Sequence, residues 1–415
     1  MKSSTRAGLA ALAGVAVITS GCSSKAESNQ SSDEGGVEVG AGISDGTINL
    51  GMMVDLSGPF APIGRELSQA AELYWDQKNE DGGVCGQFPV QLDLKDNAYN
   101  VQTTVSLYSG MRDNVLAFQN ILGTAPSLAL ADSLSADDML VVLHGQGQEA
   151  LGYENIMLAN ATFDIEAANG LGYLLEQGAI TSGGTIGHIY LEGSYGEGVL
   201  EGVEKFADVN DMTVRGIQIT PAVTDMTPAI ADLSSAEIDV LVVSGSPPQL
   251  ASAAGAAAAA GLDVPILGSG PTWTSGLLDT SAGDVLRDKL YVAFPSASFD
   301  NPTASDFRDA YIAEYPGEDP SLQIMLEYVE ARALDAVLEQ ACENGDLTRA
   351  GVMAAKSEVT SVETEGTAPV LDLSDPAKPA TGEEYIMRAA DVPGGLEVVE
   401  GPYISEVGQE ILDAK

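Results

Sequence analysis

Positive charge is the scarcest property of this chain: 18 of its 415 residues are Lys or Arg, against 61 Asp or Glu, which gives a formal net charge of −43. A surface of this sign repels phosphate backbones and anionic lipid head groups, because binding either one requires clustered Lys and Arg. We therefore expect no nucleic-acid partner. The acidic residues are scattered rather than grouped in blocks, so they indicate a solvated surface and say little about a ligand.

Residues suited to metal binding and to catalysis are also few. The chain has two histidines, His144 and His188. His188 lies inside an apolar run and is expected in the core, whereas His144 ends such a run, where it could contact a ligand. A lone His is a poor metal site, and the chain has no Walker loop of the form Gly-x-x-x-x-Gly-Lys-Ser/Thr. We expect no metal, no cofactor and no enzymatic activity.

Long apolar runs are missing after the first 22 residues, since the small-residue run 251–260 is too short to span a bilayer. Residues 1–21 are different: Lys2 and Arg6 precede an apolar run over 9–18 and then small residues, which is typical of an export signal. The small residues before Cys22 resemble the lipobox of bacterial lipoproteins, although Thr19 stands where that motif usually has Leu or Val. We expect an extracytoplasmic protein attached to the membrane only through a lipid on Cys22; a plain secretory signal is the alternative.

Cysteine is scarce too, with three residues in all. If Cys22 carries the lipid, Cys85 and Cys342 remain as a pair in an oxidising compartment, and we predict a disulfide between them. The alternative is two buried free thiols.

Residues 22–46 carry Ser, Gly, Asp and Glu and few large apolar side chains, which predicts a flexible tether. The mature chain beyond it is longer than one hydrophobic core usually organises and indicates two domains. From residue 47, short apolar runs alternate with segments of helical period, beginning with a strand over 48–54 and a helix around Leu67 and Trp75. This βαβα order predicts an α/β fold with parallel sheets covered by helices on both faces.

In open parallel sheets, ligands bind outside the carboxyl ends of the strands. Seven loops follow the predicted strands, and they are rich in Gly, Ser, Pro and aromatic residues: 55–65, 97–100, 123–128, 144–148, 191–198, 244–248 and 268–273. For a single loop, these residues are best explained as turn formers. Seven such loops together favour a cleft for a small polar ligand.

Four blocks occur in order along the chain: Leu56-Ser57-Gly58-Pro59 with Gly64, Lys95-Asp96-Asn97, residues 123–127, and Tyr195-Gly196-Glu197-Gly198. These blocks resemble the leucine/isoleucine/valine-binding family of type I periplasmic binding proteins, which serve ABC importers. The order and spacing of these blocks over 47–415 carry the resemblance. It implies two Rossmann-like lobes joined by a three-crossover hinge, with crossovers near 158–160, 292–294 and 366–371.

The lobe boundaries follow from these crossovers. Lobe 1 is expected to comprise residues 47–158 plus 292–368, and lobe 2 residues 159–291 plus 369–415. Cys85 and Cys342 then both fall in lobe 1, so the disulfide would not hinder closure of the lobes.

The resemblance also implies the ligand contacts. Family members hold a carboxylate on lobe 1 hydroxyls and backbone N–H groups, which here correspond to Ser127, Gly145 and Gly147; leucine-binding members have a Thr at the position of Gly147. Tyr195 matches the lobe 2 aromatic residue that closes over the ligand, with packing as the alternative role. The full set of expected ligand-binding residues is Ser57, Phe60, Ile63, Ser127, Gly145, Gln146, Gly147, Tyr195, Ser246, Gly270 and Trp273.

One departure bears on the ligand. The family's ammonium-binding Glu would fall at or near Gly270, and no acid stands there. A buried ammonium group without a charged partner is costly, so we expect a ligand other than a standard zwitterion, such as a carboxylate or an amide. Phe60, Tyr195 and Trp273 are expected to enclose it, and Ser127, Gln146 and Gln148 to hydrogen-bond it. A shift of the alignment would instead bring Glu197 or Asp164 into the ammonium-binding role.

The expected function is that of a monomeric solute-binding protein that delivers a small organic ligand to an ABC permease. A ligand-sensing receptor domain of the same fold is the first alternative. The second is an exported enzyme that uses Gly145-Gln146-Gly147, since this loop and Ala150 fit the letter of the dinucleotide fingerprint. The expected ribose-binding acid is missing about 20 residues later, which disfavours the enzyme.

Overall fold

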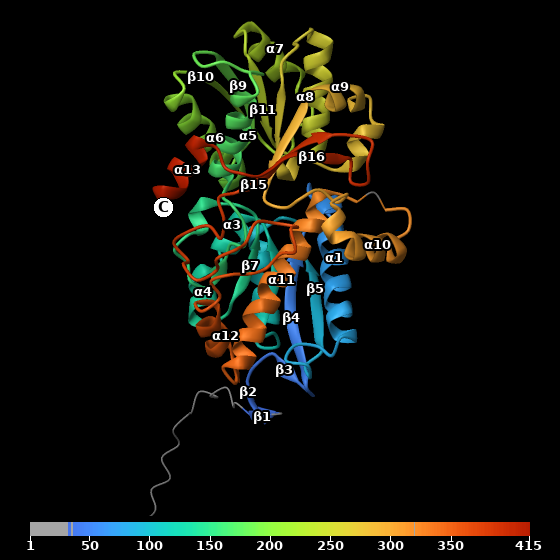
Figure 1. The fold of residues 1–415 in the computed structure, drawn as a ribbon, viewed down its shortest axis with the longest axis vertical. Helices are drawn as coiled ribbons and strands as arrows, with labels where there is room; N and C mark the ends of the chain where they lie inside the picture. The colour runs from blue at the N-terminus through green and yellow to red at the C-terminus, as the bar shows by residue number, and fades with distance from the viewer. Residues whose placement is uncertain (1–31, 35, 319) are drawn as a thin grey trace, which may run out of the picture. The chain divides into compact units, whose positions relative to one another are not determined.

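The alternating runs of the sequence form two sheets with helices around them in the computed structural model, which describes residues 32–34, 36–318 and 320–415 (Figure 1). The predicted signal and Cys22 lie outside these residues. Among the described residues, no helix is both long enough and apolar enough to cross a membrane.

The first sheet has the order β3-β4-β6-β7-β8, with β5 paired to β4. Every pairing is parallel except that of β3 with β4. Helices α1 and α11 pack against each other beside this sheet (Figure 1). The strands are β3 (Ile43–Ser44), β4 (Thr47–Val54), β5 (Val90–Asp96), β6 (Ala117–Leu122), β7 (Val141–His144) and β8 (Ile156–Met157). The helices are α1 (Ala61–Glu80), α2 (Val101–Met111), α3 (Thr124–Leu128), α4 (Ala131–Ala136), α10 (Ser305–Glu314), α11 (Leu322–Glu343) and α12 (Arg349–Lys356).

The turn from β4 into α1 shows how the sequence positions the cleft loops. The buried Asp55 carboxylate accepts the Phe60 N–H at 2.8 Å and so organises the start of the helix. A Cβ at Gly64 would lie 1.8 Å from the Asp55 carbonyl oxygen, so only glycine fits where the helix crosses the end of the strand.

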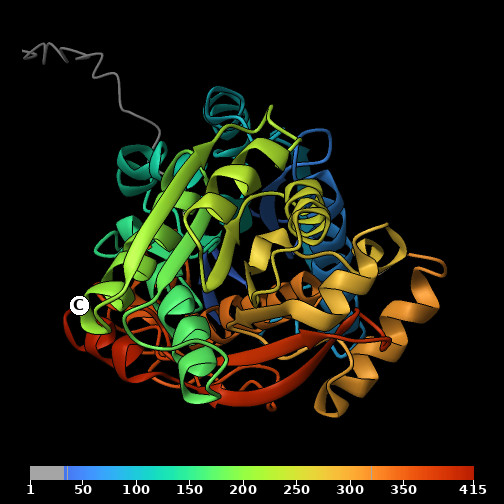
Figure 2. The same cartoon turned by 90° about the horizontal axis from the view of Figure 1, so that it is seen from above.

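The second sheet has the order β10-β9-β11-β12-β13-β15-β16, parallel from β10 to β13 and antiparallel at β15 and β16. Figure 2 shows these two C-terminal strands along one side of the sheet. The prediction of a parallel sheet is therefore confirmed from β10 to β13 but not at β15 and β16. The strands are β9 (Thr185–Leu191), β10 (Thr213–Ile219), β11 (Val240–Ser244), β12 (Ile266–Ser269), β13 (Leu290–Phe294), β15 (Glu384–Ala389) and β16 (Leu396–Tyr403). The helices are α5 (Phe163–Glu176), α6 (Ser194–Val209), α7 (Thr227–Ser235), α8 (Pro247–Ala260), α9 (Gly283–Lys289) and α13 (Glu406–Asp413).

The chain passes between the two sheets three times, after β8, after β13 and before β15. We call the unit around the first sheet lobe 1 (36–159 and 299–380) and the unit around the second lobe 2 (162–294 and 384–415). Two expected boundaries are corrected: residues 292–294 are part of β13 in lobe 2, and residues 369–380 pack in the core of lobe 1 through Leu371, Leu373 and Ala380. A short apolar motif locates a crossover only roughly, because packing into one of the two cores decides to which lobe the motif belongs.

The expected tether ends earlier than residue 46. Strands β1 (Ser32–Glu34) and β2 (Val37–Val39) pair with each other, and β2 adds in parallel to β14 (Asp346–Leu347) of lobe 1. The expectation of a flexible spacer is therefore wrong from residue 32 onward. Val37 and Val39 are 8% and 3% exposed, and burying these two side chains offsets the cost of ordering the segment.

The predicted disulfide is confirmed: Cys85 and Cys342 are bonded, with their Cα atoms 5.8 Å apart. Cys85 follows α1 and Cys342 lies in the last turn of α11, so the bond ties together two helices of lobe 1 that already pack against each other.

Candidate functional site

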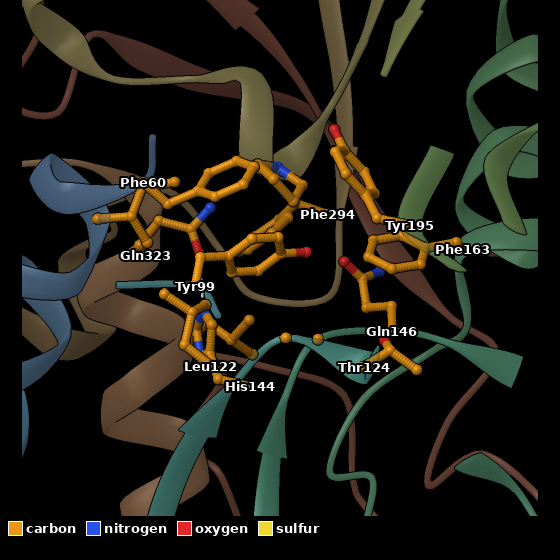
Figure 3. A pocket seen from close by; sticks show the side chains of 15 residues that line it. Phe60, Tyr99, Leu122, Thr124, His144, Gln146, Phe163, Tyr195, Phe294 and Gln323 are labelled. Atoms are coloured by element: carbon orange, nitrogen blue, oxygen red, sulfur yellow. Dashed lines mark hydrogen bonds between the residues drawn. The ribbon is translucent and has the colours of Figure 1, made fainter. Parts of the chain in front are cut away.

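A cavity lies where the carboxyl ends of β6 and β7 meet loops of lobe 2 (Figure 3). It contains about 480 Å³ of space not filled by protein atoms, a figure that includes open solvent. Most of the lining side chains are aromatic or aliphatic. The lining residues are Phe60, Ile63, Tyr99, Leu122, Gly123, Thr124, His144, Gly145, Gln146, Phe163, Tyr195, Pro271, Phe294, Gln323 and Leu326.

The structure brings five of the predicted ligand-binding residues together at this cavity. They are Phe60, Ile63, Gly145, Gln146 and Tyr195. The Phe60 and Tyr99 rings are tilted against each other with centroids 4.7 Å apart on the lobe 1 side, and those of Phe163 and Tyr195 are tilted with centroids 4.9 Å apart on the lobe 2 side. Their side chains therefore form opposing aromatic walls (Figure 3).

Four other predicted contacts lie elsewhere because their side chains have local structural roles. The Ser127 hydroxyl donates to the Gly123 carbonyl at 3.0 Å within its own helical turn. Ser246 caps α8 in a capping box with Gln249. The Trp273 indole N–H donates to Gly394 O at 3.1 Å in the core of lobe 2, and Ser57 is exposed beside Asp96.

Gln148 makes a contact between the lobes rather than a wall of the cavity. Its Nε2 donates to Glu201 Oε2 of α6 at 2.7 Å. The loop that carries it continues into a single 3₁₀ turn, Gln148–Ala150, instead of an α-helix. The dinucleotide fingerprint needs a helix N-terminus at this point to receive the pyrophosphate, so the structure removes the main support for a dinucleotide site at Gly145 and Gly147.

Gly147 does not line the cavity, but its missing side chain has a clear explanation. A Cβ at Gly147 would lie 2.4 Å from Thr124 Oγ1 and 2.3 Å from Thr124 Cγ2. The hydroxyl of Thr124 therefore occupies the space beside Gly147, where the resemblance led us to expect a threonine. The polar group is present at the site, but it comes from the neighbouring loop.

At Gly270, too, a neighbouring side chain fills the space of the missing one, but here the neighbour is apolar. A Cβ at Gly270 would lie 2.2 Å from Cδ2 of the Phe294 ring, and Phe294 lines the cavity. Where the resemblance implies an acid that binds an ammonium group, the structure places an aromatic ring. No Asp or Glu is among the lining residues, within the part of the chain that the structure describes.

Two polar atoms in the cavity wall have no hydrogen-bond partner: Thr124 Oγ1 and Gln146 Nε2. Both side chains are nearly inaccessible, with 3% and 2% of their surface exposed. Figure 3 shows the two side chains near each other on one side of the cavity. Buried donors without partners are uncommon in folded proteins, and these two are suited to bind an oxygen of a ligand.

His144 connects the cavity to a buried acidic cluster. Its Nδ1 lies 2.8 Å from Glu330 Oε2 and its Nε2 lies 3.0 Å from Gln323 Oε1. The nearby charges of Glu330 and Glu327 raise the pKa of His144, despite burial, which acts in the opposite direction. Burial raises the pKa of Glu327 to about 8. Glu327 and its hydrogen-bonded neighbours therefore form a cluster that holds a proton.

The same cluster has residue types that could bind a metal. His144, Glu327 and Glu330 offer ligand atoms within 4.8 Å of one another. However, both ring nitrogens of His144 are already used, one by Glu330 and one by Gln323. The arrangement therefore fits a hydrogen-bonded network better than a metal centre. His188, as expected, is a buried core residue, with Nε2 2.8 Å from Ser244 Oγ and a pKa lowered to about 3 by burial.

The network continues into lobe 2 through Gln323. Gln323 Nε2 donates to Gly270 O at 3.2 Å, and the Gly270 N–H donates to Glu166 Oε1 at 3.3 Å. Burial raises the pKa of Glu166 to about 7, and the neighbouring side chains of Ser269 and Gln146 and the Gly270 N–H, which favour the charged form, offset this only in part. Residues 144, 323, 270 and 166 thus form a chain of hydrogen bonds across the cleft.

The family model described as "Periplasmic binding protein" matches residues 47–391, which is most of the chain. The chain belongs to the periplasmic binding protein family. The alternation of strands and helices in two lobes, the three crossovers and the cavity between the lobes agree with this membership.

Named relatives and solved structures agree at the level of the family. The chain is 32% identical to a fatty acid ABC transporter substrate-binding protein from Thermomonospora curvata, with a TM-score of 0.87 and coverage of 91% of this chain and 97% of that one. A branched chain amino acid ABC transporter structure from Thermus thermophilus with bound valine shares the fold, with a TM-score of 0.77, 18% identity and coverage of 88% and 98%.

Curated relatives match over part of their length. A Leu/Ile/Val-binding protein of Rhizobium johnstonii is 23% identical over 209 residues, or 49% of this chain and 55% of that protein. A Leu/Ile/Val-binding protein homologue of Brucella melitensis biotype 1 is 24% identical over 203 residues, or 48% and 54%. The chain thus matches a little over half the length of each.

Sequence reasoning missed several residues of the cavity: Leu122, Gly123, Thr124, Tyr99, Phe163, Pro271, Phe294, Gln323 and Leu326. Thr124 and Tyr99 lie in loops that were predicted to face the cleft, so the loop rule could have found them. Gln323 and Leu326 come from the start of α11, and nothing near them in the sequence signals a strand end.

Proposed function

We propose that this protein is the extracytoplasmic solute-binding component of an ABC importer, and that its ligand is a carboxylic acid with a long apolar body, such as a fatty acid. One observation carries the proposal: the cavity is walled by apolar side chains and offers two unpartnered polar groups, Thr124 Oγ1 and Gln146 Nε2. The apolar wall would bury the hydrocarbon, and these two groups would donate to the carboxylate.

The cavity is poorly suited to a free amino acid. An amino acid brings an ammonium group, which needs a carboxylate partner when it is buried. The described lining contains no acid, and the ring of Phe294 fills the space at Gly270. The similarity to the fatty acid substrate-binding protein of Thermomonospora curvata supports the same choice.

Ligand binding tests the proposal directly. The purified protein, stripped of bound lipid, is titrated with decanoate and palmitate and, in parallel, with leucine and valine. A ligand at a hundredfold its dissociation constant adds about 2.7 kcal/mol to the free energy of unfolding, which a melting curve detects. We expect the fatty acids to raise the melting temperature and the amino acids to leave it unchanged. Stabilisation by leucine or valine alone would contradict the proposal.

Import and sensing share this capture step and differ in the fate of the captured ligand. We favour import, and deletion of the gene should abolish uptake of the labelled acid.

We also propose that Cys22 carries a lipid. Labelling of the wild-type protein with an alkyne fatty acid in the producing bacterium should be lost in Cys22→Ala, with release of the protein into the medium; equal labelling of both would refute the anchor.

A further inference from the structure

The proposed carboxylate cavity contains no fixed positive charge. Among the described residues that line it, none is Lys or Arg, and the ionisable side chains are Tyr99, His144 and Tyr195. Burial raises the pKa of both tyrosines, that of Tyr99 to about 12, so they stay neutral at physiological pH. His144 is therefore the one lining group that could balance the charge of a carboxylate.

The charge of His144 is already matched from within lobe 1. Glu330 Oε2 lies 2.8 Å from Nδ1, and Glu327 Oε2 lies 3.8 Å from the same nitrogen. Both carboxyl groups are fully buried on α11. The remaining ring nitrogen faces the amide oxygen of Gln323. Two carboxyl groups thus face one imidazole, and no surplus positive charge is left for a ligand.

The lobe 2 side adds further acid. Glu166 on α5 is 2% exposed and accepts the Gly270 N–H through Oε1. Its Oε2 has no partner at ordinary hydrogen-bond geometry, and the side chains of Ser269 and Gln146 lie close enough to favour the charged form of the carboxyl group. The cavity residue Gln146 is a neighbour of this carboxyl group. Glu384 on β15 is fully buried, and burial raises its pKa; the nearby charge of Glu166 raises it further.

A lysine on this side is paired with another carboxylate. Asp164, also on α5, lies 2.9 Å from Lys415 Nζ at the end of the chain. The Asp164 carboxylate adds a second negative influence on Glu384. Within the described part of the chain, the groups around Glu166 therefore give it no cation of its own.

We propose that capture of the ligand carboxylate is coupled to uptake of one proton from solvent, and that Oε2 of Glu166 receives this proton. This inference rests on the proposed function. An anion that enters a low-dielectric cavity raises the proton affinity of nearby carboxyl groups, and an unpaired buried charge is more costly than a neutral pair. The step forms one O–H bond on Glu166 and breaks none in the ligand.

The direction of the pH dependence follows from the starting state. The pKa of Glu166 is raised to about 7 by burial, so the group is largely ionised above that pH and largely protonated below it. Binding then takes up close to one proton above pH 7 and fewer below. Affinity for a carboxylate should consequently weaken as the pH rises from 7 to 9, by up to tenfold per pH unit.

Calorimetry tests this inference on the full-length mature protein. Decanoate is titrated from pH 7 to pH 9, at each pH in two buffers that differ in ionisation enthalpy, which gives the number of protons taken up. We expect close to one proton at pH 8.5 and a dissociation constant that rises up to tenfold per pH unit. Decanamide, which is uncharged, should bind with a dissociation constant that does not change over the same range.

Two variants assign the proton. Glu166→Gln should remove both the pH slope and the proton uptake for decanoate, whereas Glu204→Gln, an exposed change on α6, should leave both as in the wild type. If a folded Glu166→Gln variant keeps the slope, the assignment to Glu166 is wrong. If that variant does not fold, the proton count of the wild type still decides whether uptake occurs.

The outcomes separate this inference from the proposed function. Binding of decanoate with no proton uptake and a constant affinity would overturn the inference and leave the proposed function intact. Failure of decanoate and palmitate to bind at any pH would overturn the proposed function and the inference with it.

Discussion

The Phe294 ring occupies the space above Gly270 so closely that a Cβ at position 270 would lie 2.2 Å from Phe294 Cδ2. Each of these residues therefore requires the other. The pair links strand β13 with the 3₁₀ turn after β12, and it determines that this wall of the cavity is aromatic rather than acidic.

This pairing predicts strong coupling between two substitutions. Gly270→Ala should destabilise the protein by about 1 to 3 kcal/mol through overpacking, and Phe294→Ala by about 3 to 5 kcal/mol through loss of buried ring volume. In the double variant, the cost of Gly270→Ala should largely disappear, because the ring is gone. Urea unfolding of the four proteins measures the coupling, and strictly additive effects would contradict it. Gly255→Ala, which meets no atom within 4 Å in α8, is the control and should not destabilise.

Thr124 provides a second prediction about ligand binding. Thr124→Val removes the unpartnered hydroxyl with little change of shape, and we expect decanoate affinity to fall by about 1.5 to 3 kcal/mol, the value of a hydrogen bond to a charged group. Calorimetry at constant pH measures the loss. Thr213→Val on the exposed start of β10 is the matched control and should bind as the wild type does. Equal affinities of the Thr124 variant and the wild type would remove Thr124 from the site.

The disulfide predicts a redox-dependent stability. The bond joins residues 257 positions apart, so it restricts the unfolded chain strongly, and its loss should cost about 2 to 5 kcal/mol. The reduced wild type and the unreduced Cys85→Ser/Cys342→Ser variant should melt at the same temperature. The unreduced wild type should melt at a higher temperature. Alkylation of the unreduced mature protein should find both cysteines blocked; two reactive thiols would refute the bond.

Buried carboxyl groups predict that stability declines in alkaline solution. Burial raises the pKa of Glu166 to about 7 and of Glu327 to about 8, both above the ordinary value of 4.5. The folded state then keeps protons that the unfolded state releases, so the free energy of unfolding should fall by about 1.4 kcal/mol per pH unit from pH 5 to 7 for Glu166 and from pH 5 to 8 for Glu327. Below pH 6.5 the lowered pKa of His188 opposes this fall with a slope of the same size, so the clearest decline is expected above pH 6.5. Urea unfolding at several pH values, in enough salt to screen the acidic surface, measures the slope.

A matched pair of variants checks the origin of that slope. Glu327→Gln should reduce it, because the amide keeps the shape of the side chain and cannot titrate. Glu204→Gln on the surface should not. A free energy of unfolding that is flat or rises over this range in the wild type would show that these carboxyl groups are ionised in the folded protein.

The sequence predicted the elements of this fold well because each carries its own periodic signal. The run at 48–54 corresponds to β4, and the helix expected around Leu67 and Trp75 is α1. The antiparallel strands β15 and β16 were not foreseen. Their pairing depends on which edge of the second sheet is free once the other strands have assembled, and this is not a local property.

The site was predictable only in part for a related reason. The loop rule located Phe60, Gln146 and Tyr195 correctly at the cavity. It could not decide between Thr124 and Ser127, which lie on one short helix, because the outcome depends on the direction in which that helix turns each hydroxyl. Nor could it find Gln323, whose partner His144 is 179 residues away in the chain.

Strand β2 adds to β14 at the far end of lobe 1, and residues of lobe 2 take no part in that three-stranded sheet. The first described strands are therefore built into lobe 1 alone. A rotation of lobe 2 about the three crossovers would leave these strands and their pairing with β14 unchanged.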